Sequence, residues 1–239
     1  MRVNYNYIKI FGLLALVVFL CAFSSERNAK RKLPTPEIKF IGDDNLFVTH
    51  ETVSKLLIVN EGTVTNKPKE IIDLNELETA LKSNQMIKNA QVFMSVNGLI
   101  TAEIEQRKPI ARVRTSASYY IDDEGHFMPL SHNYTARVPL VTGAVDKNNL
   151  QNIYQVAKKV QEDDFLLVHV VEIHQNNDKT IDLKFRNQEF TIHLGNLELL
   201  DKKINNLKAF YVKAKKDNLL DDYQLVNLKF DQQVICSKK

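Results

Sequence analysis

An uncharged apolar run near the N-terminus limits the possible folds of this chain more than any other feature of its sequence. Residues 10–23 read IFGLLALVVFLCAF, whereas a helix that crosses a bilayer needs about 20 apolar residues. The flanking residues extend the usable span, because Lys9 can reach toward the head groups and tyrosines and serines tolerate the interface. The sequence therefore predicts a membrane anchor over residues 10–25, preceded by a short end at residues 1–9.

A cleaved signal peptide is the alternative interpretation of this run. Small residues at 22 and 24 have the spacing that a signal peptidase accepts. The basic cluster at 27–32 also outweighs Arg2 and Lys9, so the positive-inside count leaves the orientation open. An anchor with its N-terminus inside and a cleaved signal both place the remaining chain outside the cytoplasm.

The net charge of +3 is unevenly distributed. Residues 1–36 carry +5 and the remaining residues carry −2. A basic cluster beside an apolar run suits anionic membrane lipid, whereas a near-neutral body offers no broad face for phosphates. We therefore expect lipid as a partner and no nucleic acid.

A polar, basic and proline-containing segment over residues 26–36 is typical of a linker. Alternation over residues 38–41 then predicts a short strand. Thr49 is a good N-cap for a first helix. The apolar residues of that helix fall on one face: Val53, Leu56 and Leu57.

Asp73 and Glu76 have the spacing of a capping box at the start of a second helix. Its apolar residues recur at helical spacing: Leu74, Leu77, Ala80 and Leu81. Apolar residues then alternate over 90–96 and 100–104, on either side of Asn97-Gly98, which predicts a hairpin with a type I′ turn. These elements make a compact βααββ domain over residues 37–109.

Residues 110–239 predict a second domain, built from closely spaced strands and two helices. The expected elements are strands over 119–121 and 127–130, a helix over 148–161, strands over 165–174, 179–186 and 189–194, a helix over 197–216, and a last strand over 224–230 that could extend to Cys236. We expect the strands to form an antiparallel sheet. The fold class of the whole chain is therefore α+β.

Motifs that carry catalytic chemistry are missing from the sequence. It contains no G-x-S-x-G, no P-loop and no G-x-G-x-x-G, and its six histidines show no metal-ligand spacing. Residues 122–125 suit a hairpin turn better than a calcium loop, because no bidentate glutamate follows at the required spacing. We expect no catalytic residue, metal, cofactor or small-molecule substrate, and therefore no enzyme.

The order of several short motifs resembles that of the FtsQ/DivIB family of bacterial cell-division proteins, whose first exported domain is a POTRA domain. The resembling motifs are IKFIG at 38–42, EQRKPIA at 105–111, YID with a later glycine at 120–125, VPLVTG at 138–143, LG at 194–195 before a lysine-bearing helix, and VNLKFD at 226–231. The match covers nearly the whole chain.

The resemblance implies a single-pass scaffold in the cell inner membrane, with its N-terminus inside, its bulk in the periplasm and enrichment at the division septum. Its last strand would recruit FtsB-like and FtsL-like partners by strand addition. The matching partner-binding positions are Lys229, Phe230, Gln232, Gln233, Val234 and Asn196. Phe230 would be the anchor. The chain has no tryptophan, and Asn196 stands where the family often has arginine, so the contact would differ in detail.

Two other functions remain as alternatives. POTRA-like domains also occur in envelope assembly and secretion accessory proteins, but only 130 residues follow the first domain and no barrel fits them. A small exported hydrolase would need a polar catalytic cluster, which the sequence does not nominate.

Overall fold

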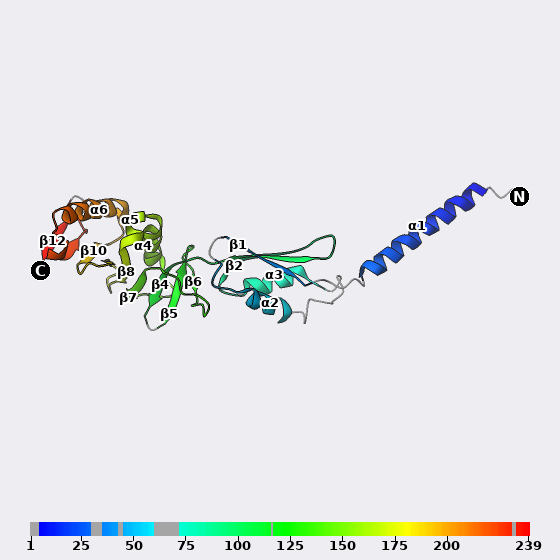
Figure 1. Ribbon diagram of the computed structural model, residues 1–239, viewed down its shortest axis with the longest axis horizontal. Coiled ribbons are helices and arrows are strands. Elements are labelled where there is room, and N and C mark those ends of the chain that lie inside the picture. The colour runs from blue at the N-terminus through cyan, green and yellow to red at the C-terminus, as the bar shows by residue number, and fades with distance from the viewer. Residues whose placement is uncertain (1–4, 30–34, 43–44, 60–71, 116, 231–232) are drawn as a thin grey trace. The chain divides into compact units, whose positions relative to one another are not determined.

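A computed structural model describes residues 5–29, 35–42, 45–59, 72–115, 117–230 and 233–239. The chain forms two compact units, Met1–Gln106 and Arg107–Lys239 (Figure 1). Each unit has a hydrophobic core of its own.

The first unit begins with a long apolar helix, α1 (Tyr5–Ala29). Its stretch Lys9–Arg27 has a mean hydropathy of 1.8 and none of its side chains is buried. The helix is longer than the apolar run that predicts it, because polar residues at both ends continue the same backbone hydrogen bonding. Its length and composition suit a membrane span.

The rest of the first unit is a βααββ arrangement, as the sequence predicts. Its elements are β1 (Glu37–Ile41), α2 (His50–Val59), α3 (Leu74–Lys82), β2 (Ile87–Met94) and β3 (Ile100–Gln106). The strands pair in the order β1-β3-β2, with β1 parallel to β3. Both helices lie against one face of this sheet (Figure 1).

The predicted N-caps Thr49 and Asp73 are confirmed. The Thr49 hydroxyl accepts from the Thr52 amide at 3.2 Å, and the Asp73 carboxylate accepts from the amides of Asn75 and Glu76. Each cap satisfies amides that would otherwise lack a partner in the first helical turn. The caps therefore place the first turns of α2 and α3.

The predicted type I′ turn between β2 and β3 is wrong. That turn needs positive φ at both central residues, but only Gly98 has it, at 87°, and Asn97 does not. The Gly98 amide donates to Ser95 O and the Ser95 amide to Leu99 O, each at 2.9 Å. The loop is therefore one residue longer, with Val96 98% exposed at its tip.

Gln106 closes the core of the first unit at the end of β3. Its side-chain oxygen accepts from the amides of Phe47 (2.9 Å) and Val48 (3.0 Å), and its side-chain nitrogen donates to Val48 O at 2.9 Å. The residue is 7% exposed. This amide pairing fixes the segment before α2 to the sheet, and the sequence pattern does not predict it.

The second unit contains one nine-stranded sheet. Its strands are β4 (Pro109–Arg114), β5 (Ser118–Asp122), β6 (Phe127–Met128), β7 (Leu140–Gly143), β8 (Val170–Gln175), β9 (Ile181–Phe185), β10 (Thr191–Gly195), β11 (Tyr223–Asn227) and β12 (Ile235–Lys238). They pair in the order β12-β11-β10-β9-β8-β7-β4-β5-β6.

The sheet is mixed and not wholly antiparallel, which corrects the prediction. Neighbours joined by tight turns, such as β8 and β9, are antiparallel. The pairs β4–β7, β7–β8 and β10–β11 are parallel. In the last two pairs the connection contains a helix, which returns the chain to the starting end of the sheet. The α+β class is confirmed.

Helices α4 (Gln151–Glu162), α5 (Asp164–His169) and α6 (Leu200–Lys216) lie on one side of this sheet (Figure 1). A short 3₁₀ turn, η2 (Leu220–Asp222), precedes β11. The strand predicted over 165–174 is wrong in its first half, because Asp163 accepts from the amides of Phe165 and Leu166 and starts α5. Strands β4 and β7 are not among the predicted elements.

Candidate functional site

Strand β12 is a free edge of the second unit's sheet. Among the described residues it pairs only with β11, in an antiparallel register that places Val226 opposite Cys236 and Asn227 opposite Ile235. The backbone groups on its outer side are therefore available to another strand.

The end of β12 is tied to the rest of the unit by its last residue. The Lys239 amide donates to Asp222 O at 2.9 Å, and its ammonium lies 2.5 Å from Glu189 Oε2. The hydrogen bond from Lys239 lowers the pKa of the Glu189 carboxyl, and the same bond raises the pKa of Lys239. These contacts hold β12 in place against β11.

The predicted last strand is two strands, and this moves the expected partner-binding residues. The Leu228 amide still donates to His193 O on β10, at 2.9 Å. The Lys229 amide instead donates to the Asn227 side-chain oxygen at 2.9 Å, and this local bond ends β11. Lys229, Phe230, Gln233 and Val234 consequently lie in the β11–β12 loop, and Gln232 lies outside the described residues.

Exposed apolar side chains gather at this edge. Phe230 is 44% exposed in the loop and Ile235 is 42% exposed at the start of β12. Val234 and Cys236 instead pack against the core. Burial raises the pKa of the Cys236 thiol, so this group is a packing contact and a poor nucleophile. Sequence reasoning did not identify Ile235, although a short apolar segment before the C-terminus was visible.

The sixth expected residue, Asn196, lies in the turn after β10. Its side-chain oxygen accepts from Lys203 at 2.8 Å and its side-chain nitrogen donates to Glu198 at 3.0 Å. Sequence reasoning missed Lys203, which is 2% exposed. Its position three residues after Leu200 and four before Leu207 places it on the apolar stripe of α6.

The sheet face opposite the helices is polar. Residues that alternate with the core on β7 to β10 share this face: Thr142, Glu172, His174, Asp182, Lys184 and His193. The Thr142 hydroxyl donates to Glu172 at 2.7 Å, and His193 Nδ1 lies 2.6 Å from Asp182 Oδ1. Burial would raise the pKa of Glu172, but Thr142 and Lys184 outweigh it and the pKa is lowered. Among the described residues of β7 to β10, no large apolar side chain is exposed on this face.

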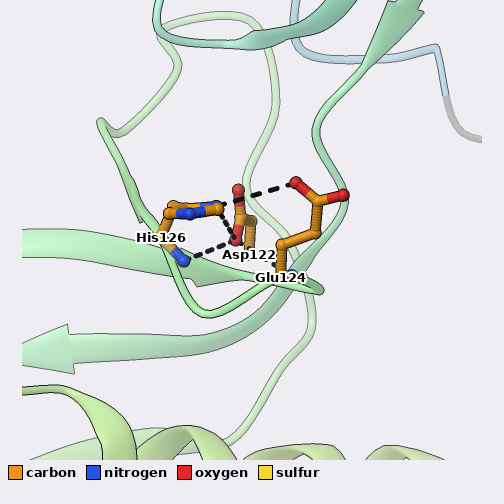
Figure 2. Close-up of side chains that lie close together, drawn as sticks. All are labelled: Asp122, Glu124 and His126. Carbon is orange, nitrogen blue, oxygen red and sulfur yellow. Dashed lines mark hydrogen bonds and ion pairs between the residues drawn. The ribbon is translucent and has the colours of Figure 1, made fainter.

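A second polar cluster lies in the turn between β5 and β6. Donor atoms of Asp122, Glu124 and His126 lie within 4.8 Å of one another (Figure 2). Asp122 Oδ1 accepts from the amides of His126 (2.7 Å) and Glu124 (3.1 Å), and Oδ2 accepts from Arg107 at 2.5 Å. Both oxygens of Asp122 are thus engaged in the turn, which supports the predicted hairpin and not a metal site.

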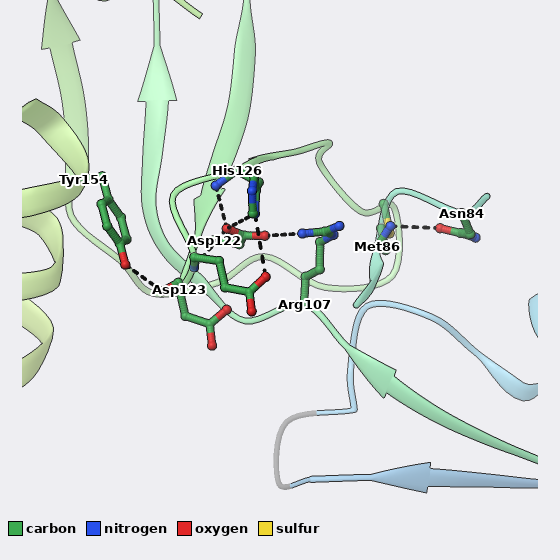
Figure 3. Close-up of polar contacts among 8 residues, drawn as sticks. Asn84, Met86, Arg107, Asp122, Asp123, His126 and Tyr154 are labelled. Carbon is green, nitrogen blue, oxygen red and sulfur yellow. Dashed lines mark hydrogen bonds and ion pairs between the residues drawn. The ribbon is translucent and has the colours of Figure 1, made fainter. Parts of the chain in front are cut away.

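The same turn is fixed from the side of α4. The Tyr154 hydroxyl donates to Asp123 O at 3.2 Å (Figure 3), and a Cβ on Gly125 would lie 3.0 Å from the Tyr154 ring. Gly125 has a φ of 84°. The turn is therefore a structural device of the fold, and the sheet edge at β12 remains the candidate functional site.

Comparison with known proteins agrees with this architecture. Residues 108–237 match the family model described as FtsQ/DivIB, C-terminal related, and residues 42–105 match the POTRA-like domain. The chain belongs to the FtsQ/DivIB family. It is also similar to the cell division protein DivIB of Clostridium tetani (strain Massachusetts / E88), with 24% identity over 189 residues that cover 71% of this chain and 68% of the relative.

Membership of the FtsQ/DivIB family assigns the chain a role in cell division. Together with α1, it indicates a single-pass membrane protein whose first folded domain is POTRA-like. The resemblance drawn from the short motifs is confirmed.

Proposed function

We propose that this protein is a non-catalytic scaffold of the division machinery that binds FtsB-like and FtsL-like single-pass proteins through the edge strand β12. The observation that carries the proposal is the position of β12. β12 is the outermost strand at one end of the sheet. Ile235 is exposed at its start, and Phe230 is exposed in the loop that precedes it. An incoming strand would gain main-chain hydrogen bonds and apolar contacts at one place.

Residues of the β11–β12 loop would contact the partner beside the added strand. Phe230 would be the anchor, because a large ring buries much area at a small cost in conformational entropy. The other contributing positions are Lys229, Gln232, Gln233, Val234 and Asn196. Lys229 and Gln233 lie in the loop, so their side chains would flank the partner strand and would not alternate along it.

The anchor α1 would hold the protein in the same membrane as its partners. The N-terminus would be cytoplasmic, the two units would lie on the periplasmic side of the inner membrane, and the protein would be enriched at the septum. Partners anchored in the same membrane would meet the edge at a raised effective concentration, which compensates for a weak contact. The test is microscopy of a fluorescent fusion: midcell accumulation supports the proposal, and uniform envelope staining contradicts it.

Phe230→Ala tests the binding site directly. The matched control is Phe93→Ala, because Phe93 in the first unit is also 44% exposed. For the FtsB-like protein of the same cell, we expect Kd to rise about tenfold with Phe230→Ala, as for an interface anchor, and to stay unchanged with Phe93→Ala. Equal Kd values for both variants, or no binding by the unmodified chain, would contradict the proposal.

A further inference from the structure

Lys203 is a charged residue at a buried position of α6, where helical periodicity predicts an apolar residue. It is the fourth residue of α6 and lies between Leu200 and Ile204 on the face that packs on the sheet. Only 2% of its surface is exposed. Burial of an ammonium group is costly unless hydrogen bonds replace its water shell, so this residue needs a structural or functional reason.

Lys203 donates hydrogen bonds to the end of β10 and to the turn that follows it. Its ammonium donates to Leu194 O at 3.2 Å, to Asn196 O at 2.8 Å and to Asn196 Oδ1 at 2.8 Å. The pairing of β10 with β9 skips Leu194 at an irregularity in the register. Lys203 thus supplies three donors to a place where the sheet pairing is interrupted.

This turn has a backbone that needs support. Gly195 has a φ of 73° and Leu199 a φ of 52°, and a left-handed conformation is unfavourable for leucine. No side chain caps the start of α6. Lys203 bonds both the backbone oxygen and the side-chain oxygen of Asn196, so the ammonium holds the turn and the Asn196 side chain in one conformation.

The turn lies beside the start of the β11–β12 loop. A Cβ placed on Gly195 would lie 3.7 Å from Lys229 Cγ and 3.9 Å from Lys229 Cα, so the space between Gly195 and Lys229 is only as wide as one added carbon. The loop is also bonded to β10 one residue earlier, through Leu228 and His193. A shift of this turn would therefore reach Lys229, at the start of the candidate partner-binding loop, through the strand β10 and the narrow space beside Gly195.

We infer that Lys203 is a positioning residue for partner capture, acting through Asn196. The inference rests on the proposed function, and it adds that the position of Lys229 and Phe230, at the start of the binding loop, is set from inside α6. A methionine at this position would fill similar space but donate no hydrogen bond, so the turn and Asn196 would lose their fixed conformation.

The test compares Lys203→Met with Lys202→Met in the full-length protein in lipid nanodiscs. Lys202 is the exposed neighbour on the same helix. The probe is the exported part of the FtsB-like protein of the same cell, and Kd is measured where circular dichroism shows each variant folded. We expect a rise in Kd of about tenfold for Lys203→Met and no change for Lys202→Met.

Combination with Asn196→Ala separates positioning from a merely structural role. If Lys203 acts through Asn196, the double variant binds no more weakly than Lys203→Met alone, because the two changes remove the same arrangement. If Kd of the double variant rises by the product of the two single-variant factors, the inference is overturned. Amide hydrogen exchange at residues 196–199 and 229–230 should also be faster in Lys203→Met than in Lys202→Met.

The outcomes distinguish this inference from the proposed function. An unmodified chain that does not bind the probe overturns both. Binding by the unmodified chain that Lys203→Met leaves unchanged overturns the role of Lys203 alone. If Lys203→Met does not fold, amide exchange in Asn196→Ala decides: faster exchange at residues 229–230 supports the inference, and unchanged exchange there overturns it.

Discussion

Arg107 Nη1 lies 2.5 Å from Asp122 Oδ2, and the Asp122 side chain is only 1% exposed. The pair joins the first residue of the second unit to the turn between β5 and β6. The Asp123 amide donates to Lys108 O at 2.9 Å and supports the same connection. The hairpin turn and the beginning of the unit therefore stabilise each other.

Arg107→Met should lower the free energy of unfolding of the second unit by about 3 kcal/mol, because it leaves a buried carboxylate without its charged partner. Adding Asp122→Asn should recover part of this loss, since the uncompensated charge is then removed. His126→Ala is the control, and for this exposed residue we expect a change below about 0.5 kcal/mol. Urea unfolding followed by circular dichroism measures all three. Equal losses for Arg107→Met and His126→Ala would contradict the assignment.

Asp163→Ala should destabilise the second unit by about 1–2 kcal/mol, because the side chain caps α5. Asp163→Asn keeps a capping oxygen and loses only the charge that faces Lys208 Nζ at 2.5 Å. Its loss should therefore be smaller, below about 1 kcal/mol. If urea unfolding shows a larger loss of stability for Asp163→Asn than for Asp163→Ala, the capping role of Asp163 is contradicted.

The charge of Asp163 also predicts a pH dependence. Burial would raise the pKa of this carboxyl, but the Lys208 hydrogen bond and the Leu166 and Phe165 amides outweigh it, so the folded pKa lies below 3.8. The stabilisation is therefore complete well above pH 4 and is lost as the pH falls from about 4 through the folded pKa. The stability difference between the unmodified protein and Asp163→Asn should shrink from pH 7 to pH 3. A constant difference would contradict this.

Gly143→Ala should prevent the second unit from folding stably. Gly143 ends β7 with a φ of 90°, and a Cβ there would lie 2.1 Å from the Gln175 carbonyl oxygen on the neighbouring strand. Gly195→Ala is the matched control, because its φ is also positive but its Cβ meets only ordinary contacts. We expect a loss of more than about 4 kcal/mol for the first and about 1–2 kcal/mol for the second. Similar urea midpoints would refute the steric argument.

Local patterns predicted the first unit well because each element there carries its own signal. Asp73 marks a helix start, and alternation on both sides of Gly98 marks two strands. The turn type was wrong because the loop closes through Ser95 and Leu99, one residue beyond the pair that suggests a type I′ turn.

The second unit was harder to predict, because some of its decisive contacts join distant residues and others are local side-chain caps that override the strand-like composition. Strand β11 ends where Leu228 bonds to His193, and nothing local to residues 224–230 shows that bond. Leu166 and its neighbours suit a strand by composition, yet the Asp163 cap makes them helical. Lys203 could have been suspected, since it interrupts an apolar stripe, but its acceptors in the turn after β10 are visible only in the folded chain.

Hydrogen exchange of the β12 amides, Ile235–Lys238, with and without the FtsB-like partner tests strand addition most directly. An added strand would bond the outward amides of β12, so their exchange should slow at least about tenfold. Strand β6 (Phe127–Met128), at the other end of the sheet, should not change. Partner binding that leaves the exchange of Ile235–Lys238 unaltered would contradict capture at this edge.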